Sequence, residues 1–285
     1  MKNTADSPVV RPHLAHHFHS ARQQFDAGKL GIWLFLLTEV LFFSGLFCAY
    51  AVYRASHPEI FNYAHYFLDT RLGALNTCIL LVSSLSAALA VRFAQLAQRR
   101  ALVLSITVTI VCAFGFLGVK YIEYAHKFQD GLLPGVYFNP HEHVWETPAF
   151  EQRHPEASAF AEHLRAFAAT GKAEDVANHL RFARPTRAEL EPLLKAGVLG
   201  PKAEYPEFPS QPRNAHLFFG IYFMMTGLHG IHVLGGIGVW SWLLVRSLRG
   251  EFGASYFGPI DYAALYWHLV DLIWIYLFPL LYLIH

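Results

Sequence analysis

Charged residues are scarce in this chain of 285 residues: they occupy 15% of positions, and the formal net charge is only +1. This near balance removes the strongly basic surface that binding to nucleic acid requires, so we expect no nucleic-acid partner. Hydrophobic residues make up 54% of the sequence. Such a composition is too apolar for a typical soluble domain, and it indicates a membrane protein that carries a polar insert.

Cysteine is rare as well. The three cysteines, Cys48, Cys78 and Cys112, lie in separate apolar runs, which is typical of small buried side chains and not of disulfide partners. The sequence also lacks a Cys-x-x-Cys-His haem motif, the paired cysteines of a copper electron-entry site and a glycine-rich phosphate loop. We therefore expect no catalytic centre, no metal and no redox cofactor on this chain.

Long apolar runs are abundant instead, and five of them are long enough to cross a bilayer as helices. They cover about residues 30–53, 73–97, 101–124, 215–245 and 262–284. The predicted fold is an all-α, polytopic membrane bundle of five transmembrane helices with a small extramembrane helical insert. The predicted segments are an N-terminal tail (1–29), helices 1–3 (30–124), the insert (125–214) and helices 4–5 (215–285).

The distribution of lysine and arginine predicts the orientation of these spans. If the spans alternate in direction, nine basic residues share one side: Lys2, Arg11, Arg22, Lys29, Arg92, Arg99, Arg100, Arg246 and Arg249. The short loop on the opposite side carries only Arg54 and Arg71. By the positive-inside rule, the N-terminus is cytoplasmic, and the insert and the C-terminus lie on the outer face.

Within the insert, the hydrophobic pattern predicts short amphipathic helices at residues 156–169 and 173–182. A third helix is predicted to begin at the capping-box pattern Thr186-Arg-Ala-Glu189. With 90 residues (125–214) and little hydrophobic periodicity, the insert is expected to form a small helical cap and not an enzyme domain.

Several ionisable residues interrupt the apolar runs. Glu39 lies near the centre of the first run, where a charged group costs at least about 2.5 kcal/mol, so such residues are usually functional or paired. His229 and His232 share one face of the fourth predicted helix, and His268 and Asp271 share one face of the fifth. Glu123, at the end of the third run, completes this buried polar framework.

Two interpretations of the framework remain open. Imidazole and carboxylate groups are ligands for a metal or a haem iron, so His229, His232 and His268 could build a redox site. The second interpretation, which we favour, is hydrogen bonding between helices, with Glu39 bonded to His229 or His232 and nearby glycines permitting close packing.

Four motifs resemble the cytochrome c oxidase subunit III family of the haem-copper oxidases. They are Thr38-Glu-Val-Leu-Phe-Phe-Ser-Gly-Leu-Phe, Lys120-Tyr-Ile-Glu-Tyr124, Phe223-Met-Met-Thr-Gly-Leu-His-Gly-Ile-His-Val233 and Tyr266-Trp-His-Leu-Val-Asp-Leu-Ile-Trp274. By this resemblance, Glu39 corresponds to the family's buried carbodiimide-reactive glutamate and Glu123 to its glutamate-tyrosine site. The long form of the family has seven spans, and the first two have no counterpart here, as in five-helix bacterial relatives. An extended subunit I often supplies that missing pair of helices.

The resemblance implies an accessory, non-redox subunit of a proton-pumping terminal oxidase in a bacterial inner membrane, with the insert in the periplasm. Haem and copper would lie on the partner subunits I and II. The subunit would bind structural phospholipids, with Arg22, Arg71 and Arg246 as candidate phosphate partners, and would support proton uptake and stability during turnover.

Other functions remain open. The oxidase could take its electrons from cytochrome c or from quinol. The long insert departs from the family pattern, so it could dock another respiratory complex or a cytochrome c-type donor. A self-contained haem or metal protein is the third alternative.

Overall fold

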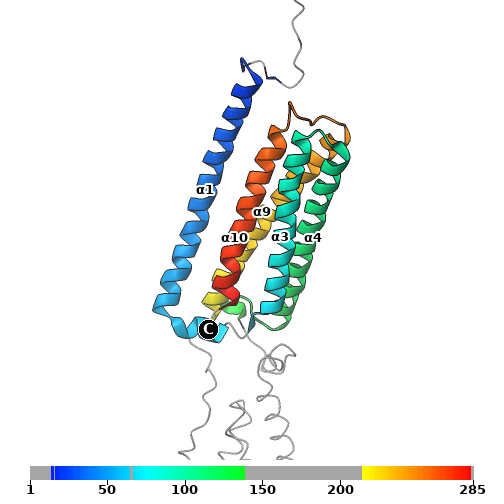
Figure 1. The fold of residues 1–285 in the computed structure, drawn as a ribbon. Coiled ribbons are helices and arrows are strands. Elements are labelled where there is room, and N and C mark those ends of the chain that lie inside the picture. The colour runs from blue at the N-terminus through cyan, green and yellow to red at the C-terminus, as the bar shows by residue number, and fades with distance from the viewer. Residues whose placement is uncertain (1–13, 16, 65–66, 139–213, 284–285) are drawn as a thin grey trace, which may run out of the picture. The chain divides into compact units, whose positions relative to one another are not determined.

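Five long helices dominate the computed structural model, which describes residues 14–15, 17–64, 67–138 and 214–283 (Figure 1). They are α1 (Ala21–Ser56), α3 (Thr70–Gln95), α4 (Arg99–Gln129), α9 (His216–Leu248) and α10 (Gly258–Tyr282). Each is long and apolar enough to cross a membrane. The predicted all-α bundle with five membrane helices is therefore confirmed, and the chain is a multi-pass membrane protein.

Two short helices accompany the long ones: α2 (Pro58–Ala64) and the 3-10 helix η2 (Gly135–Tyr137). The sequence pattern did not predict α2, which opens with proline at its first position, where the missing N–H costs nothing. The helices predicted at 156–169, at 173–182 and from Thr186 lie outside the described residues.

The first long helix begins earlier than the apolar run suggests. Ser20 caps α1, because its Oγ accepts a hydrogen bond from the backbone N–H of Gln23 at 3.1 Å. The Gln23 side chain reaches back and accepts from the backbone N–H of His19 at 2.9 Å. The cap lets the helix form over polar residues, so its start is Ala21 and not a position near residue 30.

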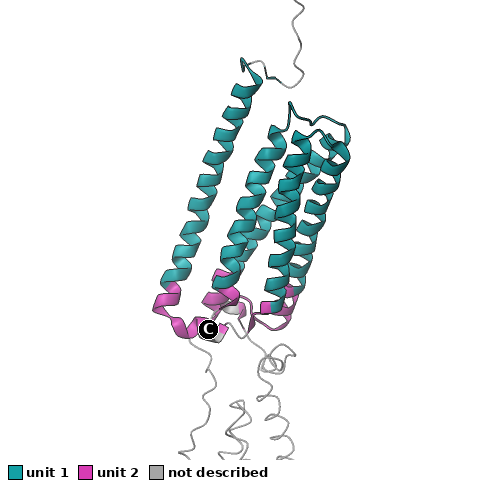
Figure 2. Cartoon of the chain, viewed as in Figure 1, with its two compact units in different colours: residues 1–52, 71–122, 223–280 teal, residues 53–70, 123–222, 281–285 magenta. Residues whose placement is uncertain are grey.

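The chain divides into two compact units (Figure 2). Unit 1 contains Met1–Val52, Arg71–Ile122 and Phe223–Leu280, which is most of the five long helices. Unit 2 contains Tyr53–Thr70, Glu123–Tyr222 and Leu281–His285, which includes α2, η2 and the remaining turns of the long helices. Phe61 and Phe218 pack edge to face in unit 2, with ring centroids 5.3 Å apart.

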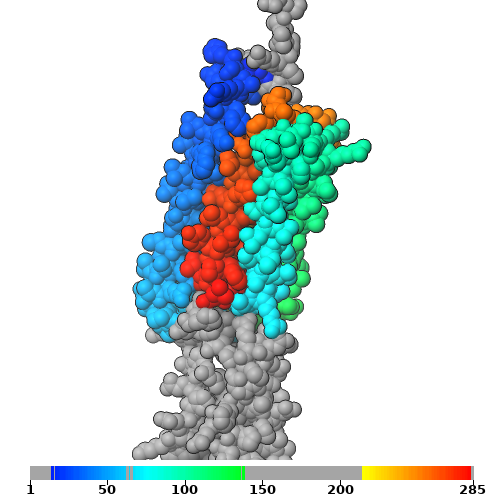
Figure 3. Space-filling view, viewed as in Figure 1, coloured from blue at the N-terminus to red at the C-terminus, as the bar shows by residue number. Residues whose placement is uncertain are grey.

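Within unit 1, α10 is central and α1 is peripheral. In the most apolar 18-residue stretch of each helix, 44% of α10 is buried, whereas 11% of α1 is buried. Side chains of α10 lie between α1 and α3 (Figure 3). Helix α1 packs through one narrow stripe, Leu36, Phe43 and Tyr50, whose heptad spacing keeps the three on one side of the helix.

Small residues set the close contacts among the remaining helices. A β-carbon added at Gly236 of α9 would overlap the ring of Trp267 on α10, so this crossing requires glycine. The Trp267 indole N–H donates to Ser83 Oγ on α3 at 2.9 Å. Ser86 on α3 lies 2.7 Å, oxygen to oxygen, from Thr109 on α4. Trp267 of α10 thus contacts α9 at Gly236 and α3 at Ser83.

Candidate functional site

Glu39 of α1 and His232 of α9 form a pair inside unit 1. His232 Nε2 lies 2.9 Å from Glu39 Oε2, and the two side chains are 19% and 18% exposed. The phenol of Tyr266, on α10, donates to the backbone carbonyl of His232 at 2.8 Å, and the Phe43 ring packs edge to face against the imidazole. Of the two histidines expected as partners for Glu39, the structure therefore selects His232.

The hydrogen bonds of His232 restrict the protons on this pair. His232 Nδ1 lies 2.7 Å from the carbonyl oxygen of Leu228, and a carbonyl only accepts, so Nδ1 carries a hydrogen. The short contact between Nε2 and Glu39 then needs one more proton, held by either atom. Imidazolium with carboxylate and imidazole with carboxylic acid are both neutral overall. The geometry thus describes a neutral pair, which a membrane interior requires.

His229 belongs to a different environment, although it lies only three residues from His232. Its side chain is fully buried, and its ring packs against Phe116 of α4 and Trp274 of α10, with centroids 5.4 Å and 5.3 Å away. Neither ring nitrogen has a hydrogen-bond partner. Unlike His232, His229 therefore faces the interior between α4, α9 and α10.

His268 and Asp271 share one face of α10, and Ser84 of α3 lies beside both. The Ser84 hydroxyl is 2.7 Å from His268 Nδ1. It is also a neighbour of Asp271, although neither carboxyl oxygen of Asp271 has a hydrogen bond of normal geometry. Asp271 is 3% exposed. His268 thus bonds one serine of α3, Asp271 lies beside the same serine, and the two residues make no pair with each other.

Glu123 is the acceptor of a dense buried network in unit 2. Its Oε1 accepts from the ammonium of Lys127 at 3.1 Å and from the phenols of Tyr222 and Tyr282 at 2.8 and 2.6 Å. Glu123 is 2% exposed and Lys127 is 3% exposed. Three donors on one oxygen stabilise a carboxylate, and the lysine cancels its charge.

Sequence reasoning missed three members of this network. The i, i+4 spacing of Glu123 and Lys127 on α4 is a signal for an ion pair and could have identified the lysine. No sequence signal identifies Tyr222 of α9 or Tyr282 of α10, because their meeting with Glu123 depends on how the helices pack.

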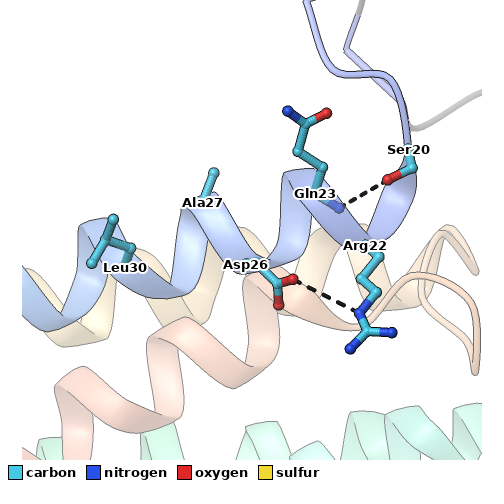
Figure 4. Close-up of a pocket in the computed structure, with 6 residues that line it drawn as sticks. All are labelled: Ser20, Arg22, Gln23, Asp26, Ala27 and Leu30. Atoms are coloured by element: carbon cyan, nitrogen blue, oxygen red, sulfur yellow. Dashed lines mark hydrogen bonds and ion pairs between the residues drawn. The ribbon is translucent and has the colours of Figure 1, made fainter.

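The three arginines proposed for lipid phosphate have different surroundings. Arg22 is exposed at the start of α1, 3.9 Å from Asp26, beside a surface pocket that Leu30 also lines (Figure 4). Arg246 binds Glu251 at 2.6 Å, and its guanidinium stacks near the rings of Trp242, Phe252 and Tyr256. Arg71 is exposed near the start of α3. Arg22 is therefore more accessible to a ligand than Arg246.

The three histidines of the alternative redox site do not converge on one point. His232 faces Glu39, His229 faces Trp274, and His268 faces Ser84. Within the described part of the chain, no three His, Cys, Asp or Glu side chains come together as a metal site would require.

The fold and these buried groups define a class of protein: a multi-pass helical membrane protein whose ionisable side chains are held between its helices. A sequence model of the family described as cytochrome c oxidase subunit III matches residues 13–139 and 202–285. The chain belongs to the cytochrome c oxidase subunit III family. Residues 140–201, between the two matched ranges, form an insert relative to that family.

Individual relatives match over shorter stretches. The chain is 34% identical over 89 residues to a probable cytochrome c oxidase subunit 3 of Mycobacterium tuberculosis, covering 30% of this chain and 44% of the relative. The cytochrome c oxidase subunit 3 of Thermostichus vulcanus is 41% identical over 72 residues, covering 25% and 36%. That of Drosophila melanogaster is 37% identical over 79 residues, covering 28% and 30%. The matched stretches thus span less than half the length of these relatives.

Proposed function

We propose that this chain is an accessory, non-redox subunit III of a proton-pumping haem-copper terminal oxidase, packed against subunit I and associated with subunit II. The observation that carries the proposal is the family match over all five long helices. Haem and copper belong to the partner subunits in this arrangement, and the chain contributes a helix bundle in which Glu39 pairs with His232 and Glu123 with Lys127. The proposed setting is a bacterial inner membrane, with a cytoplasmic N-terminus and with the insert and C-terminus in the periplasm.

The buried polar framework has a structural role in this proposal. Glu39, Glu123, His229, His232, His268 and Asp271 form the polar framework between the helices, and Glu39 stabilises the subunit and relays no pumped protons. The Glu39–His232 hydrogen bond, between two helices far apart in the sequence, supports this role.

A Glu39→Gln variant tests that role, because glutamine keeps a hydrogen-bonding group of the same size and removes the acid. We expect normal assembly, lipid content and proton-to-electron ratio in the purified oxidase reconstituted into vesicles. Loss of proton pumping with assembly and lipid content intact would show that Glu39 acts in proton transfer.

Phospholipid binding and support of proton uptake are further parts of the proposed function. Arg22, Arg71 and Arg246 are the proposed phosphate partners, and the exposed position of Arg22 beside the pocket in Figure 4 favours it among them. Substituting Arg22 with Gln should lower the phospholipid retained per purified oxidase, measured by lipid mass spectrometry. The same substitution at Arg246, which already binds Glu251, should lower it less.

The decisive experiment for the proposal is identification of the neighbouring chains. The chain, tagged and purified under mild conditions, should bring down a haem-copper subunit I and a subunit II, identified by mass spectrometry. A two-cysteine copper motif in that subunit II indicates cytochrome c as the electron donor, and its absence indicates quinol. A Soret band with stoichiometric haem on the isolated chain would instead support the self-contained haem protein.

A further inference from the structure

Beside the single unpaired atoms of Trp240 and Ser247, three buried side chains of unit 1 each carry two polar atoms without a hydrogen bond of normal geometry. They are Asn76 of α3, His229 of α9 and Asp271 of α10, which are 0%, 0% and 3% exposed. Ser84 lies beside Asp271 but makes no hydrogen bond of normal geometry with either carboxyl oxygen. Most buried polar groups in proteins are paired with protein or with ordered water, so three such residues in one helix bundle call for a ligand.

These three residues are gathered around Trp274 of α10. The His229 ring packs against the Trp274 ring at 5.3 Å between centroids. Thr77, the neighbour of Asn76 in the sequence, accepts the Trp274 indole N–H at 3.1 Å. Asp271 lies one helical turn before Trp274 and is buried on the same helix. His229 thus touches Trp274, Asn76 adjoins a residue that bonds it, and Asp271 lies one helical turn away, on three different helices.

The chemistry of the three side chains indicates what the ligand is. An amide donates and accepts, an imidazole does both, and a carboxyl group accepts and, when protonated, donates. A ligand that serves all three must therefore donate and accept in several directions, as water does when it is buried and makes about three hydrogen bonds.

We propose that ordered water molecules occupy the interior beside Trp274 and hydrogen-bond Asn76, His229 and Asp271, forming an internal hydrated site that joins α3, α9 and α10. A partner subunit cannot supply these bonds, because all three side chains are buried within this chain. The amine of Lys120 on α4, 5.1 Å from the centre of the Trp274 ring, brings a positive charge to the same region. The proposed site lies within this chain, so it does not depend on whether the oxidase takes its electrons from cytochrome c or from quinol.

Electron cryomicroscopy of the purified, assembled complex, at a resolution that shows ordered water, tests the site directly. We expect at least one water peak within hydrogen-bonding distance of two of the three side chains. Direct hydrogen bonds among the three, or a dry interior in which they stay unpaired, would overturn the proposal.

An Asn76→Leu variant tests the site by the sign of its effect on stability. Leucine has a similar size and no polar atoms. If Asn76 were truly unpaired, removing its amide would raise the melting temperature of the purified complex, because an unmet buried polar group is unfavourable. If water serves Asn76, the substitution breaks hydrogen bonds, and the melting temperature should fall by a few degrees.

The double variant with Asp271→Leu adds a test of sharing. Because the proposed waters form one connected site that serves both residues, its loss of melting temperature should be smaller than the sum of the two single losses. Ser86→Ala is the matched control, since Ser86 is buried on α3 and already has protein partners. Combined with Asp271→Leu, it should give additive losses. A rise for Asn76→Leu, or additive losses in the test pair, contradicts the proposal.

Discussion

Glu39 and Glu123 show two ways of holding a carboxyl group between membrane helices. Glu39 shares a proton with one histidine, and both side chains remain partly exposed. Glu123 is fully enclosed and meets a lysine and two tyrosines on a single oxygen atom. In both cases the net charge of the cluster is zero, which is the condition for burying ionisable groups at low energetic cost.

Lys127→Met should strongly destabilise the protein, because it leaves the Glu123 carboxylate buried without a cation. Breaking a buried ion pair in this way costs about 3–5 kcal/mol. Thermal unfolding of the purified protein measures the loss, and adding Glu123→Gln should restore much of it. Lys29→Met is the control, since Lys29 pairs with Asp261 at 3.3 Å but is 41% exposed, and exposed pairs contribute less than about 1 kcal/mol. Similar losses for both lysines would contradict the enclosed pair.

At the scale of the helices, the contact surfaces are narrow and depend on a few positions. Helix α1 buries three side chains against the bundle and adds the Glu39–His232 hydrogen bond, while most of its apolar surface stays exposed. Helices α9 and α10 cross where Gly236 admits the Trp267 ring. Because lipid is as apolar as these side chains, close packing and interhelical hydrogen bonds take the place of the hydrophobic effect in holding helices together.

Two neighbouring phenylalanines on α1 should differ sharply when replaced by alanine. Phe43 is 1% exposed and packs against His232, whereas Phe42 is 48% exposed. Phe43→Ala should cost about 3 kcal/mol of unfolding free energy, as removal of a buried aromatic ring does, and Phe42→Ala less than about 1 kcal/mol. Denaturant titration in detergent compares the two. Equal losses would mean that α1 does not pack through this stripe.

Gly236→Ala should destabilise the bundle by about 1–3 kcal/mol, because the added methyl group would overlap Trp267 and force the helices apart. Gly238→Ala, one half-turn further along the same helix, is the matched control, since nothing lies within 4 Å of its added β-carbon. There, alanine should be neutral or slightly stabilising, by its higher helix propensity. Melting temperatures of the two variants provide the measurement, and a neutral Gly236→Ala would refute the close crossing.

At the scale of the whole molecule, the family match separates the membrane helices from residues 140–201, which have no counterpart in the family model. A segment outside the family pattern is not part of what the family shares, and it suits a role specific to this chain. We propose that it docks another respiratory complex or an electron donor on the periplasmic side.

Deleting residues 140–201 should therefore leave oxygen consumption with an artificial electron donor unchanged and remove proteins that co-purify with the oxidase. Respirometry and mass spectrometry of the same preparations measure the two effects. The undeleted oxidase is the control. Loss of oxidase assembly on deletion would assign the insert to the stability of the complex, and unchanged co-purification would exclude the docking role.

The sequence by itself determined the five helices, since length and apolarity decide what can cross a bilayer. It also identified the family, through motifs that are local in the chain. It further showed that ionisable residues lie within those helices, namely Glu39, Glu123, His229, His232, His268 and Asp271. The apolar run at about 30–53 lies within α1, and Ser20 caps the helix further upstream, at a position that the run does not indicate.

Only the tertiary structure decided which of these groups meet. His229 and His232 look alike in sequence, yet His232 bonds Glu39 and His229 lies against Trp274. The two share one face only approximately, because a three-residue step stops about 60° short of a full turn and moves about 4.5 Å along the helix, which is enough to reach a different neighbour. Tyr222 and Tyr282 gave no signal in the sequence, and they meet at Glu123 only when α4, α9 and α10 pack. The sequence shows which residues lie on each helix, but which residues of different helices meet depends on the angle and register at which the helices cross.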